Sequence, residues 1–238
     1  FPAMHYSMGG LWVDYDQMTS VPGLFAVGEV DYQYHGANRL GANSLLSCLW
    51  GGMVAGPKML AYAQGLARGA ADAANGAAEH ERRRQEDAYE RIYRMGGGEN
   101  AYAIWRELGE WMTKHVTVER HNKDLQATDD KLLELEDRWG RIGLNDRGRW
   151  MNQEVSFVKQ LWNMLELARV ITIGALKRDE SRGAHYKPEF PERDDVRFLK
   201  TTMARWTPDA PAFSYEDVDV SMIKLRARKY DVDKSVSA

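Results

Sequence analysis

The feature that most constrains the fold is a long charged segment, residues 79–178, in which apolar side chains recur every three or four positions. That spacing places them on one face of an α-helix, because such a helix turns once in about 3.6 residues. Helices with one apolar face bury that face against one another. We therefore expect an antiparallel three-helix bundle with its tryptophans in the core. Its apolar stripes are Trp105, Leu108 and Met112; Leu132, Leu135, Trp139 and Ile142; and Val158, Leu161, Leu165, Ala168, Thr172 and Ala175.

The composition changes on both sides of this segment. Residues 1–67 are rich in Gly, Met and aliphatic side chains and carry few charges, which is typical of a buried α/β fragment. An Ala- and Gly-rich run at 65–78 is the expected connection. Residues 179–238 hold prolines that interrupt helices, and the alternation at 218–225 predicts a short strand. The predicted fold class is multidomain α/β plus α, with domains at 1–67, 79–178 and 179–238, the last a small irregular α+β tail.

Charge and cysteine content exclude several classes of function. The 32 Lys and Arg against 35 Asp and Glu give a net charge of -3, which argues against a general nucleic-acid binder. No stretch approaches the roughly 18 apolar residues of a membrane span. The single cysteine, Cys48, forms no internal disulfide or all-cysteine cluster, and we expect no metal site. The low cysteine content predicts a reducing compartment. Because the chain starts at Phe1 without a signal segment, we expect an excerpt of a longer protein.

A short apolar run ends at a candidate cofactor ligand. Pro22 and Gly23 predict a turn, and residues 24–27 predict a strand covered on both faces. Gly28 lets the backbone pass close to a ligand, and Glu29 follows it. An acid at such a strand end commonly accepts hydrogen bonds from sugar hydroxyls. The same pattern occurs in many α/β proteins, so a structural role for Glu29 stays open.

A second candidate element is the glycine-containing loop that leads into an apolar helix. Gly36 and Gly41 predict an unusual backbone shape, and Asn43 or Ser44 is a suitable N-cap for the helix that continues through Leu45. The first turn of a helix presents N–H groups and partial positive charge, which suit an anion or a cofactor ring that becomes anionic on reduction. The alternative is that Ser44 only caps the helix.

Two cationic or polar side chains near these elements could bind an acidic substrate. Arg39 lies in the loop, and its planar fork can hold a carboxylate through two hydrogen bonds. His5, beside Tyr6, could donate a hydrogen bond to an anion. A structural ion pair for Arg39 and a structural histidine are the alternatives that the residues alone leave open.

Five ordered blocks carry a family resemblance. They are HYSMGG, PGLFAVGE, HGANRLGANSLL, QLWNMLELARVITIGAL and ESRGAHYKPEFPERDDVRFLKTT, and they extend over essentially the whole chain. Together they resemble the flavoprotein subunit of succinate dehydrogenase and fumarate reductase, the complex II enzymes. The wording is most similar to the subgroup whose membrane anchor is a single dihaem cytochrome b. The resemblance implies that residues 1–67 are the C-terminal fragment of an FAD-binding, Rossmann-like domain.

The resemblance also implies roles for individual residues. His5 would hydrogen-bond one carboxylate of succinate or fumarate, and Arg39 would clamp a carboxylate of the same molecule. Glu29 would accept from the ribityl hydroxyls of FAD. The remaining residues expected around the flavin are Ser44 and Leu45, which would contact it, and Asn43 and His35, which would line the same pocket.

The implied function is that of a succinate:quinone oxidoreductase, which interconverts succinate and fumarate by hydride transfer to FAD. The implied partners are an iron–sulfur subunit that takes the electrons, the upstream part of the same flavoprotein, and a cytochrome b anchor reached indirectly. The implied location is peripheral, on the cytoplasmic face of the bacterial inner membrane.

Several parts of the family's machinery lie upstream of HYSMGG: the glycine-rich phosphate-binding unit, the histidine bonded to FAD, the capping domain and the proton-shuttling arginine. We therefore expect this polypeptide alone neither to hold FAD tightly nor to oxidise succinate, and we assign no catalytic residue within it. Two alternatives stay open. One is a soluble flavoenzyme similar to L-aspartate oxidase, which shares the HGANR-like loop and the SRG-H block. The other is a non-catalytic helical interaction module.

Overall fold

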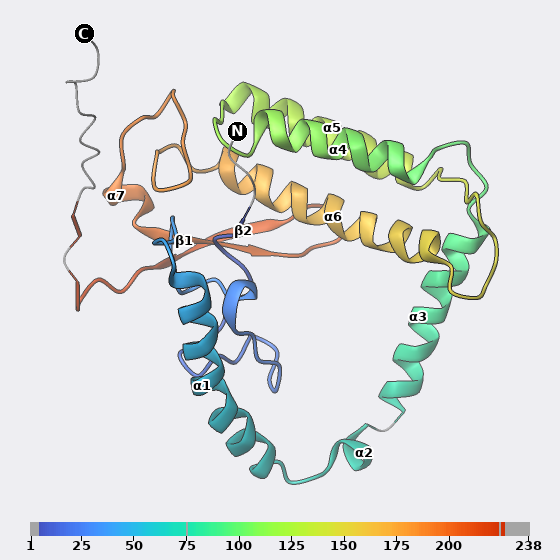
Figure 1. Ribbon diagram of the computed structural model, residues 1–238, viewed down its shortest axis with the longest axis horizontal. Coiled ribbons are helices and arrows are strands. Elements are labelled where there is room, and N and C mark those ends of the chain that lie inside the picture. The colour runs from blue at the N-terminus through green and yellow to red at the C-terminus, as the bar shows by residue number, and fades with distance from the viewer. Residues whose placement is uncertain (1–4, 75, 224, 227–238) are drawn as a thin grey trace. The chain divides into compact units, whose positions relative to one another are not determined.

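The computed structural model describes residues 5–74, 76–223, 225 and 226. The chain is rich in helices and has a small antiparallel sheet (Figure 1). It divides into two compact units, Phe1–Arg193 and Asp194–Ala238. The first unit holds the 3-10 helix η1 (Gly28–Val30) and the helices α1 (Asn43–Gln64), α2 (Ala70–Ala73), α3 (Ala77–Arg94), α4 (Ala101–His115), α5 (Asn122–Trp139) and α6 (Gln153–Leu176). The second holds α7 (Asp195–Phe198), β1 (Lys200–Arg205) and β2 (Ala212–Asp217).

The main core lies among four helices of the first unit, so the expected number of three helices in the bundle is wrong: α3 also contributes an apolar face, with Ile92 buried. Helix α5 packs against α4 and α6, and α3 adds to the other side of α6 (Figure 1). The buried faces follow the apolar spacing of the sequence, since Leu108, Leu135 and Leu165 are all at most 6% exposed. Each fully buried aliphatic side chain stabilises the fold by about 1.5–3 kcal/mol. The fully buried members of this core are Ile104, Leu132, Leu135, Ile142, Val158, Leu161 and Leu165.

The expected burial of the tryptophans is wrong for Trp105. Its side chain is 49% exposed and lies edge-on to Phe157, with ring centroids 6.2 Å apart. Ile104 and Leu108 take the core-facing positions of α4, so a residue next to Ile104 is turned about 100° away from the core. Trp139 is half-buried, and its indole N–H donates to the carbonyl of Val158 at 2.8 Å.

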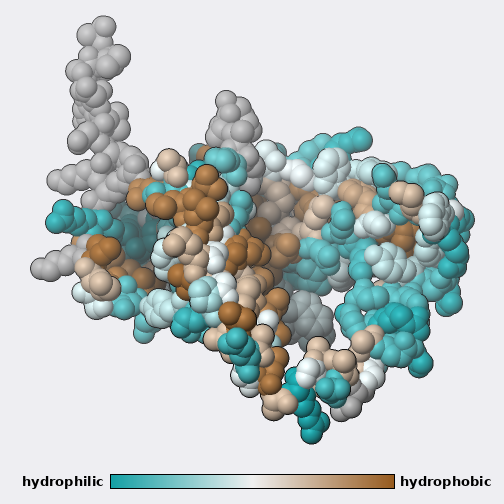
Figure 2. Space-filling view, turned by 60° about the horizontal axis from the view of Figure 1, so that its bottom comes forward, coloured by the Kyte–Doolittle hydropathy of each residue, from teal (hydrophilic) through white to brown (hydrophobic). Residues whose placement is uncertain are grey.

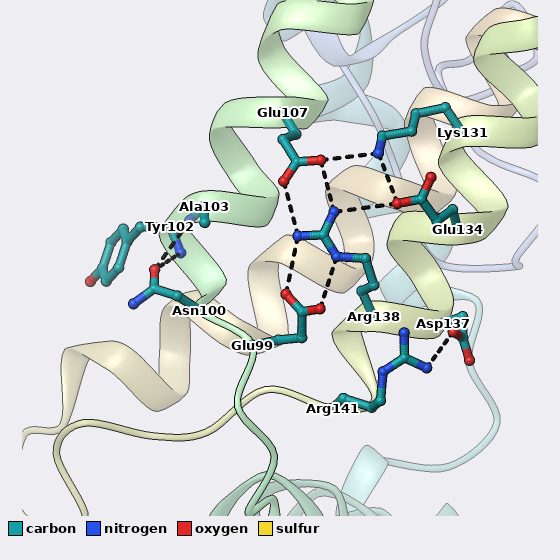
Figure 3. Close-up of polar contacts among 10 residues, drawn as sticks. All are labelled: Glu99, Asn100, Tyr102, Ala103, Glu107, Lys131, Glu134, Asp137, Arg138 and Arg141. Atoms are coloured by element: carbon teal, nitrogen blue, oxygen red, sulfur yellow. Dashed lines mark hydrogen bonds and ion pairs between the residues drawn. The ribbon is translucent and has the colours of Figure 1, made fainter.

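Charged and polar side chains join α5 to α4 (Figure 3). The guanidinium of Arg138 on α5 makes hydrogen bonds of 2.7–3.1 Å to both carboxylates, Glu99 before α4 and Glu107 within it. Lys131 also contacts Glu107, at 3.0 Å. Asn100 caps α4, because its side-chain oxygen accepts from the first backbone N–H groups of the helix. These contacts set the position of α4 on α5.

Residues 5–42 form few regular elements. The strand expected at 24–27 is wrong: the structure has only an isolated bridge between Met18 and Phe25, followed by η1. A strand needs a neighbouring strand to satisfy its backbone, and among the described residues this segment finds only single bridging pairs. The expected N-cap is also wrong, because Ala42 occupies that position with φ 65° and no side chain caps the helix.

Helix α1 presents most of its apolar side chains to the surface. Figure 2 shows these hydrophobic side chains gathered on one part of the molecule, and their exposed fractions are 59% for Leu49 and 77% for Met53. Its buried positions, such as Gly51 and Ala55, are small. The expected connection at 65–78 contains the short, exposed helix α2. None of the helices in the described part of the chain has the length and apolar character needed to cross a membrane.

The second unit is built on a hairpin. Strands β1 and β2 pair antiparallel from Lys200 opposite Asp217 to Arg205 opposite Ala212. The strand expected at 218–225 is wrong for its described residues, since β2 ends at Asp217 and no strand follows it among them. A strand after Asp217 would have to pair with residues before Lys200, and those residues belong to α7, which ends at Phe198, and to the turn after it. Position 224 lies outside the described residues.

Candidate functional site

Close backbone approach brings the His5 segment beside η1. A Cβ on Gly10 would lie 2.1 Å from the carbonyl oxygen of Val30, so only glycine fits there. The N–H of Leu11 donates to that same oxygen at 2.7 Å. The carboxylate of Glu29 accepts from the backbone N–H of Ser7 at 2.9 Å. The motif that contains His5 is therefore held against the motif that contains Glu29.

Glu29 and His5 both reach the surface at this junction. Glu29 lies in η1, where Gly28 has φ +75° and packs against Cys48 of α1 so closely that a Cβ would be 2.8 Å from its sulfur. One oxygen of Glu29 accepts from Ser7, which fixes the orientation of the carboxylate. An exposed carboxylate held in this way has lone pairs left for further donors.

Arg39 lies over the residue that follows His5. Its guanidinium carbon is 5.1 Å from the centre of the Tyr6 ring, and the side chain is half-buried. Its Nη1 atom donates to the carbonyl oxygen of Leu40 at 3.3 Å. Its Nε atom is buried and has no hydrogen-bond partner among the residues that the structure describes. A buried donor without a partner is costly, so this atom is suited to an acceptor supplied by a ligand.

The start of α1 is open. Asn43 and Ser44 are half-buried, while Leu45 is 68% exposed. No side chain caps the helix, and a Cβ on the preceding Gly41 would meet nothing within 4 Å. The N–H of Asn43 donates to the carbonyl oxygen of Leu40 at 3.3 Å. The following N–H groups of this turn and the positive end of the helix dipole are therefore available to a negatively charged group.

A polar chain connects Tyr6 to α1. The Nε2 atom of His35 lies 3.2 Å from the Tyr6 hydroxyl and 3.3 Å from the Ser47 hydroxyl. Ser47 in turn donates to the carbonyl oxygen of Ser44 at 2.7 Å. Burial lowers the pKa of His35, and the nearby positive charge of Arg39 lowers it further. The neutral imidazole is therefore the favoured form in this place.

Sequence reasoning did not assign any role to Tyr6 or Ser47. Tyr6 follows a candidate substrate residue directly, and Ser47 is three positions after Ser44, which places both serines on one face of α1. The helical spacing was a usable signal for Ser47. The contact between Tyr6 and Arg39 had none, because 32 intervening residues separate the two side chains in the sequence.

A distant turn supports the loop of Arg39 from the other side. The backbone N–H of Ala184 donates to the carbonyl oxygen of Ala37 at 2.9 Å. Gly183 has φ +61°, and a Cβ there would lie 2.4 Å from that oxygen. Behind the turn, the imidazole of His185 contacts Arg120 through Nδ1 at 2.6 Å and the carbonyl oxygen of Arg178 through Nε2 at 2.8 Å. The SRG-H block thus contacts the HGANR loop.

The site therefore combines an uncapped helix start, a half-buried guanidinium and an exposed histidine within one unit of the chain. Comparison with known protein families identifies the class to which such a chain belongs. The profile of the family described as "Fumarate reductase flavoprotein C-term" matches residues 105–230, and that of an "FAD binding domain" matches residues 1–45. The chain belongs to the succinate dehydrogenase and fumarate reductase flavoprotein family and corresponds to its C-terminal region. The family predicted from the motifs is confirmed.

Individual relatives agree. The chain is 56% identical to the succinate dehydrogenase flavoprotein subunit of Bacillus subtilis over 236 residues, which cover 98% of this chain and 40% of that protein. It is 35% identical to the fumarate reductase flavoprotein subunit of Haemophilus influenzae, over 98% of this chain and 38% of that protein. A variant of the Escherichia coli quinol fumarate reductase superposes with a TM-score of 0.85 at 34% identity, covering 94% and 38%. The chain spans about two fifths of the length of these relatives.

The residues present fit the flavin that the family name implies. The uncapped start of α1 presents N–H groups without a side-chain partner, and the exposed Leu45 offers an apolar contact next to them. Glu29 lies in η1, which packs against α1, and presents an exposed carboxylate within the same FAD-domain match. Hydrogen-bond donors for an anionic ring, an apolar contact and an acceptor for sugar hydroxyls are the groups that a flavin needs.

Proposed function

We propose that this chain forms the C-terminal part of the flavoprotein subunit of a succinate:quinone oxidoreductase. In this proposal residues 1–67 complete a Rossmann-like FAD-binding domain and residues 79–178 form a helical bundle domain. The observation that carries the proposal is Arg39, whose buried Nε has no partner among the described residues while its guanidinium lies beside the His5–Tyr6 segment. Such a donor is suited to a carboxylate, and two cationic or hydrogen-bonding groups are what a dicarboxylate requires.

His5 would hydrogen-bond one carboxylate of succinate or fumarate, and Arg39 would clamp a carboxylate of the same molecule. Bidentate hydrogen bonds from a guanidinium fix both the position and the plane of a carboxylate, which orients the carbon atoms between the two acid groups. Exposure of His5 leaves its ring able to turn toward a ligand. FAD, when bound, supplies the hydride acceptor for the carbon–carbon oxidation.

On the cofactor side, Glu29 would accept from the ribityl hydroxyls, and Ser44 and Leu45 would contact the flavin ring. Asn43 would line the same pocket. The dipole of α1 would stabilise negative charge in front of its first turn, in keeping with the uncapped start of that helix.

The proposed partners follow from the same chemistry. Electrons that leave a flavin need an acceptor, and an iron–sulfur subunit, which the family resemblance implies, would receive them. A cytochrome b anchor would attach the assembly to the cytoplasmic face of the bacterial inner membrane. The Escherichia coli structure is named a quinol fumarate reductase, and that name supports a quinol as a reaction partner of the assembly.

The experiment is a pair of arginine variants in the complete flavoprotein that carries this chain, assembled with its partners. Arg39→Gln should lower kcat/KM for succinate-dependent dye reduction by at least about 30-fold, because removing one member of a desolvated charge pair costs about 2–5 kcal/mol. Arg68→Gln is the control, since Arg68 is exposed in the connection before α2. Equal activity of both variants would contradict the proposal.

Two further measurements complete this test. Turnover of succinate should exceed that of L-aspartate, whereas the reverse would favour an L-aspartate oxidase. A protein that turns over neither substrate would favour the non-catalytic module. The isolated chain is expected to show no flavin absorbance after purification, because it spans about 40% of its flavoprotein relative.

A further inference from the structure

Arg39 is held by contacts that the proposed function does not use. A long, flexible arginine can clamp a carboxylate only when its fork is already oriented, because ordering the side chain otherwise reduces the binding free energy. Among the described residues, the guanidinium lies against the aromatic ring of Tyr6 and makes one weak hydrogen bond, to the carbonyl of Leu40. We propose that Tyr6 and His35 are positioning residues that hold the guanidinium of Arg39 ready for a dicarboxylate, an inference that rests on the proposed function.

The geometry of the pair suits this role. A guanidinium over an aromatic ring uses its face, since the ring quadrupole attracts the cation from above. Bidentate binding of a carboxylate uses the edge of the guanidinium, where the N–H bonds point. The two interactions therefore do not compete. Tyr6 can hold the plane of Arg39 at 5.1 Å while Nε, which has no partner among the described residues, keeps its hydrogen for a ligand.

The Tyr6 ring is itself anchored to α1. His35 lies edge-on to it, with ring centroids 5.1 Å apart and an interplanar angle of 84°. The hydroxyl of Ser47 has one hydrogen, which it gives to the carbonyl of Ser44 at 2.7 Å. Its contact with His35 therefore requires that Nε2 of the imidazole carry a hydrogen and donate. The same Nε2–H faces the Tyr6 oxygen at 3.2 Å.

This bonding assigns one tautomer and one direction to the chain of contacts. The Nε2–H of His35, which is held by Ser47 of α1, points toward the Tyr6 hydroxyl, and the Tyr6 ring supports the guanidinium of Arg39. Since Ser44 and Ser47 lie in the first turns of α1, the helix that faces the proposed flavin also fixes the arginine that faces the proposed substrate. Neither Tyr6 nor His35 needs to touch the dicarboxylate in this arrangement.

The test uses the assembled enzyme and separates binding from turnover. Malonate, a dicarboxylate that cannot be oxidised to an alkene, is titrated by calorimetry, and succinate kinetics are measured alongside. Tyr6→Leu and His35→Leu should each raise the malonate Kd and the succinate KM by about 5-fold or more while kcat stays within about 2-fold, because a cation–π contact acts on binding before the chemical step. Tyr6→Phe, which keeps the ring, should weaken binding less than Tyr6→Leu.

A double-variant cycle distinguishes positioning from a merely structural role. On an Arg39→Lys background, Tyr6→Leu should change the malonate Kd by less than half of the factor that it produces alone, because the two residues act through one contact. Full additivity would overturn the inference. Should Tyr6→Leu not fold, the same cycle with His35→Leu decides it, and His35→Gln, whose amide can donate, should recover most of the affinity.

The control is Tyr15→Leu, which removes a 78% exposed tyrosine near the same segment. It should leave both constants unchanged. If the parent enzyme binds no malonate at all, the proposed function fails. If the parent binds malonate and the Tyr6 and His35 variants bind it equally well, only the positioning role fails.

Discussion

The Arg138 cluster gives a prediction whose size can be worked from the structure. Arg138→Met removes a side chain that is only 17% exposed and leaves two glutamates, 28% and 33% exposed, without their main partner. Removing one partner of a fully buried ion pair lowers the free energy of unfolding by about 3–5 kcal/mol, and removing one partner of an exposed pair lowers it by about 0–1 kcal/mol. The partial burial of Arg138 places the expected loss between these limits, at about 2 kcal/mol.

The two glutamates should not contribute equally to that loss. Glu107 keeps its ion pair with Lys131 at 3.0 Å, whereas Arg138 is the one ion-pair partner of Glu99 within the described part of the chain. Adding Glu99→Gln to Arg138→Met should therefore recover about 1 kcal/mol, because it removes the unpaired charge. Arg141→Met is the matched control: its ion pair with Asp137 is more than half exposed on both sides and should cost at most about 0.5 kcal/mol.

The pH dependence checks the same contact independently. The hydrogen bond from Arg138 is the largest cause that lowers the pKa of Glu107, which falls to about 2. The folded pKa is below the ordinary value, so this stabilisation is complete above about pH 4.5 and is lost as the pH falls toward 2. Urea unfolding followed by circular dichroism should show the difference between parent and Arg138→Met shrinking over that range. A loss below about 0.5 kcal/mol at pH 7, or a difference that does not depend on pH, would refute the reasoning.

Two further predictions concern the turn at 182–185. Gly183→Ala should raise the succinate KM of the assembled enzyme by about 10-fold, because its Cβ would lie 2.4 Å from the Ala37 oxygen and displace the loop of Arg39. The control is Gly109→Ala, whose Cβ would lie in open space on α4. Equal KM values for the two variants would argue against the displacement. Burial lowers the pKa of His185 to about 4, so the unfolded state binds a proton that the folded state does not between about pH 6.5 and 4. Unfolding free energy should fall by about 2–3 kcal/mol as the pH drops through that window, allowing for partial exposure of the ring. His185→Gln should flatten this slope in urea titrations, and an unchanged slope would mean that another group is responsible.

Local periodicity accounts for what the sequence predicted well. The stripes through Leu108, Leu132 and Leu161 became buried helix faces, because a helix satisfies its own backbone and needs only an apolar neighbour. The expected strands at 24–27 and 218–225 failed for the opposite reason. A strand exists only where another strand pairs with it, and neither segment finds one among the described residues. The domain boundaries at 1–67, 79–178 and 179–238 stay predictions.

The candidate site was predictable residue by residue but not contact by contact. Arg39 and Glu29 were recognisable because their chemistry and their glycine-containing surroundings are local properties of the sequence. The orientation of Arg39 depends instead on Tyr6, 33 positions earlier, and the position of its loop depends on Gly183, 144 positions later. Each of these contacts is a weak interaction between segments whose proximity only the folded chain creates. A motif therefore identifies which side chain binds, while its affinity depends on neighbours that the motif does not contain.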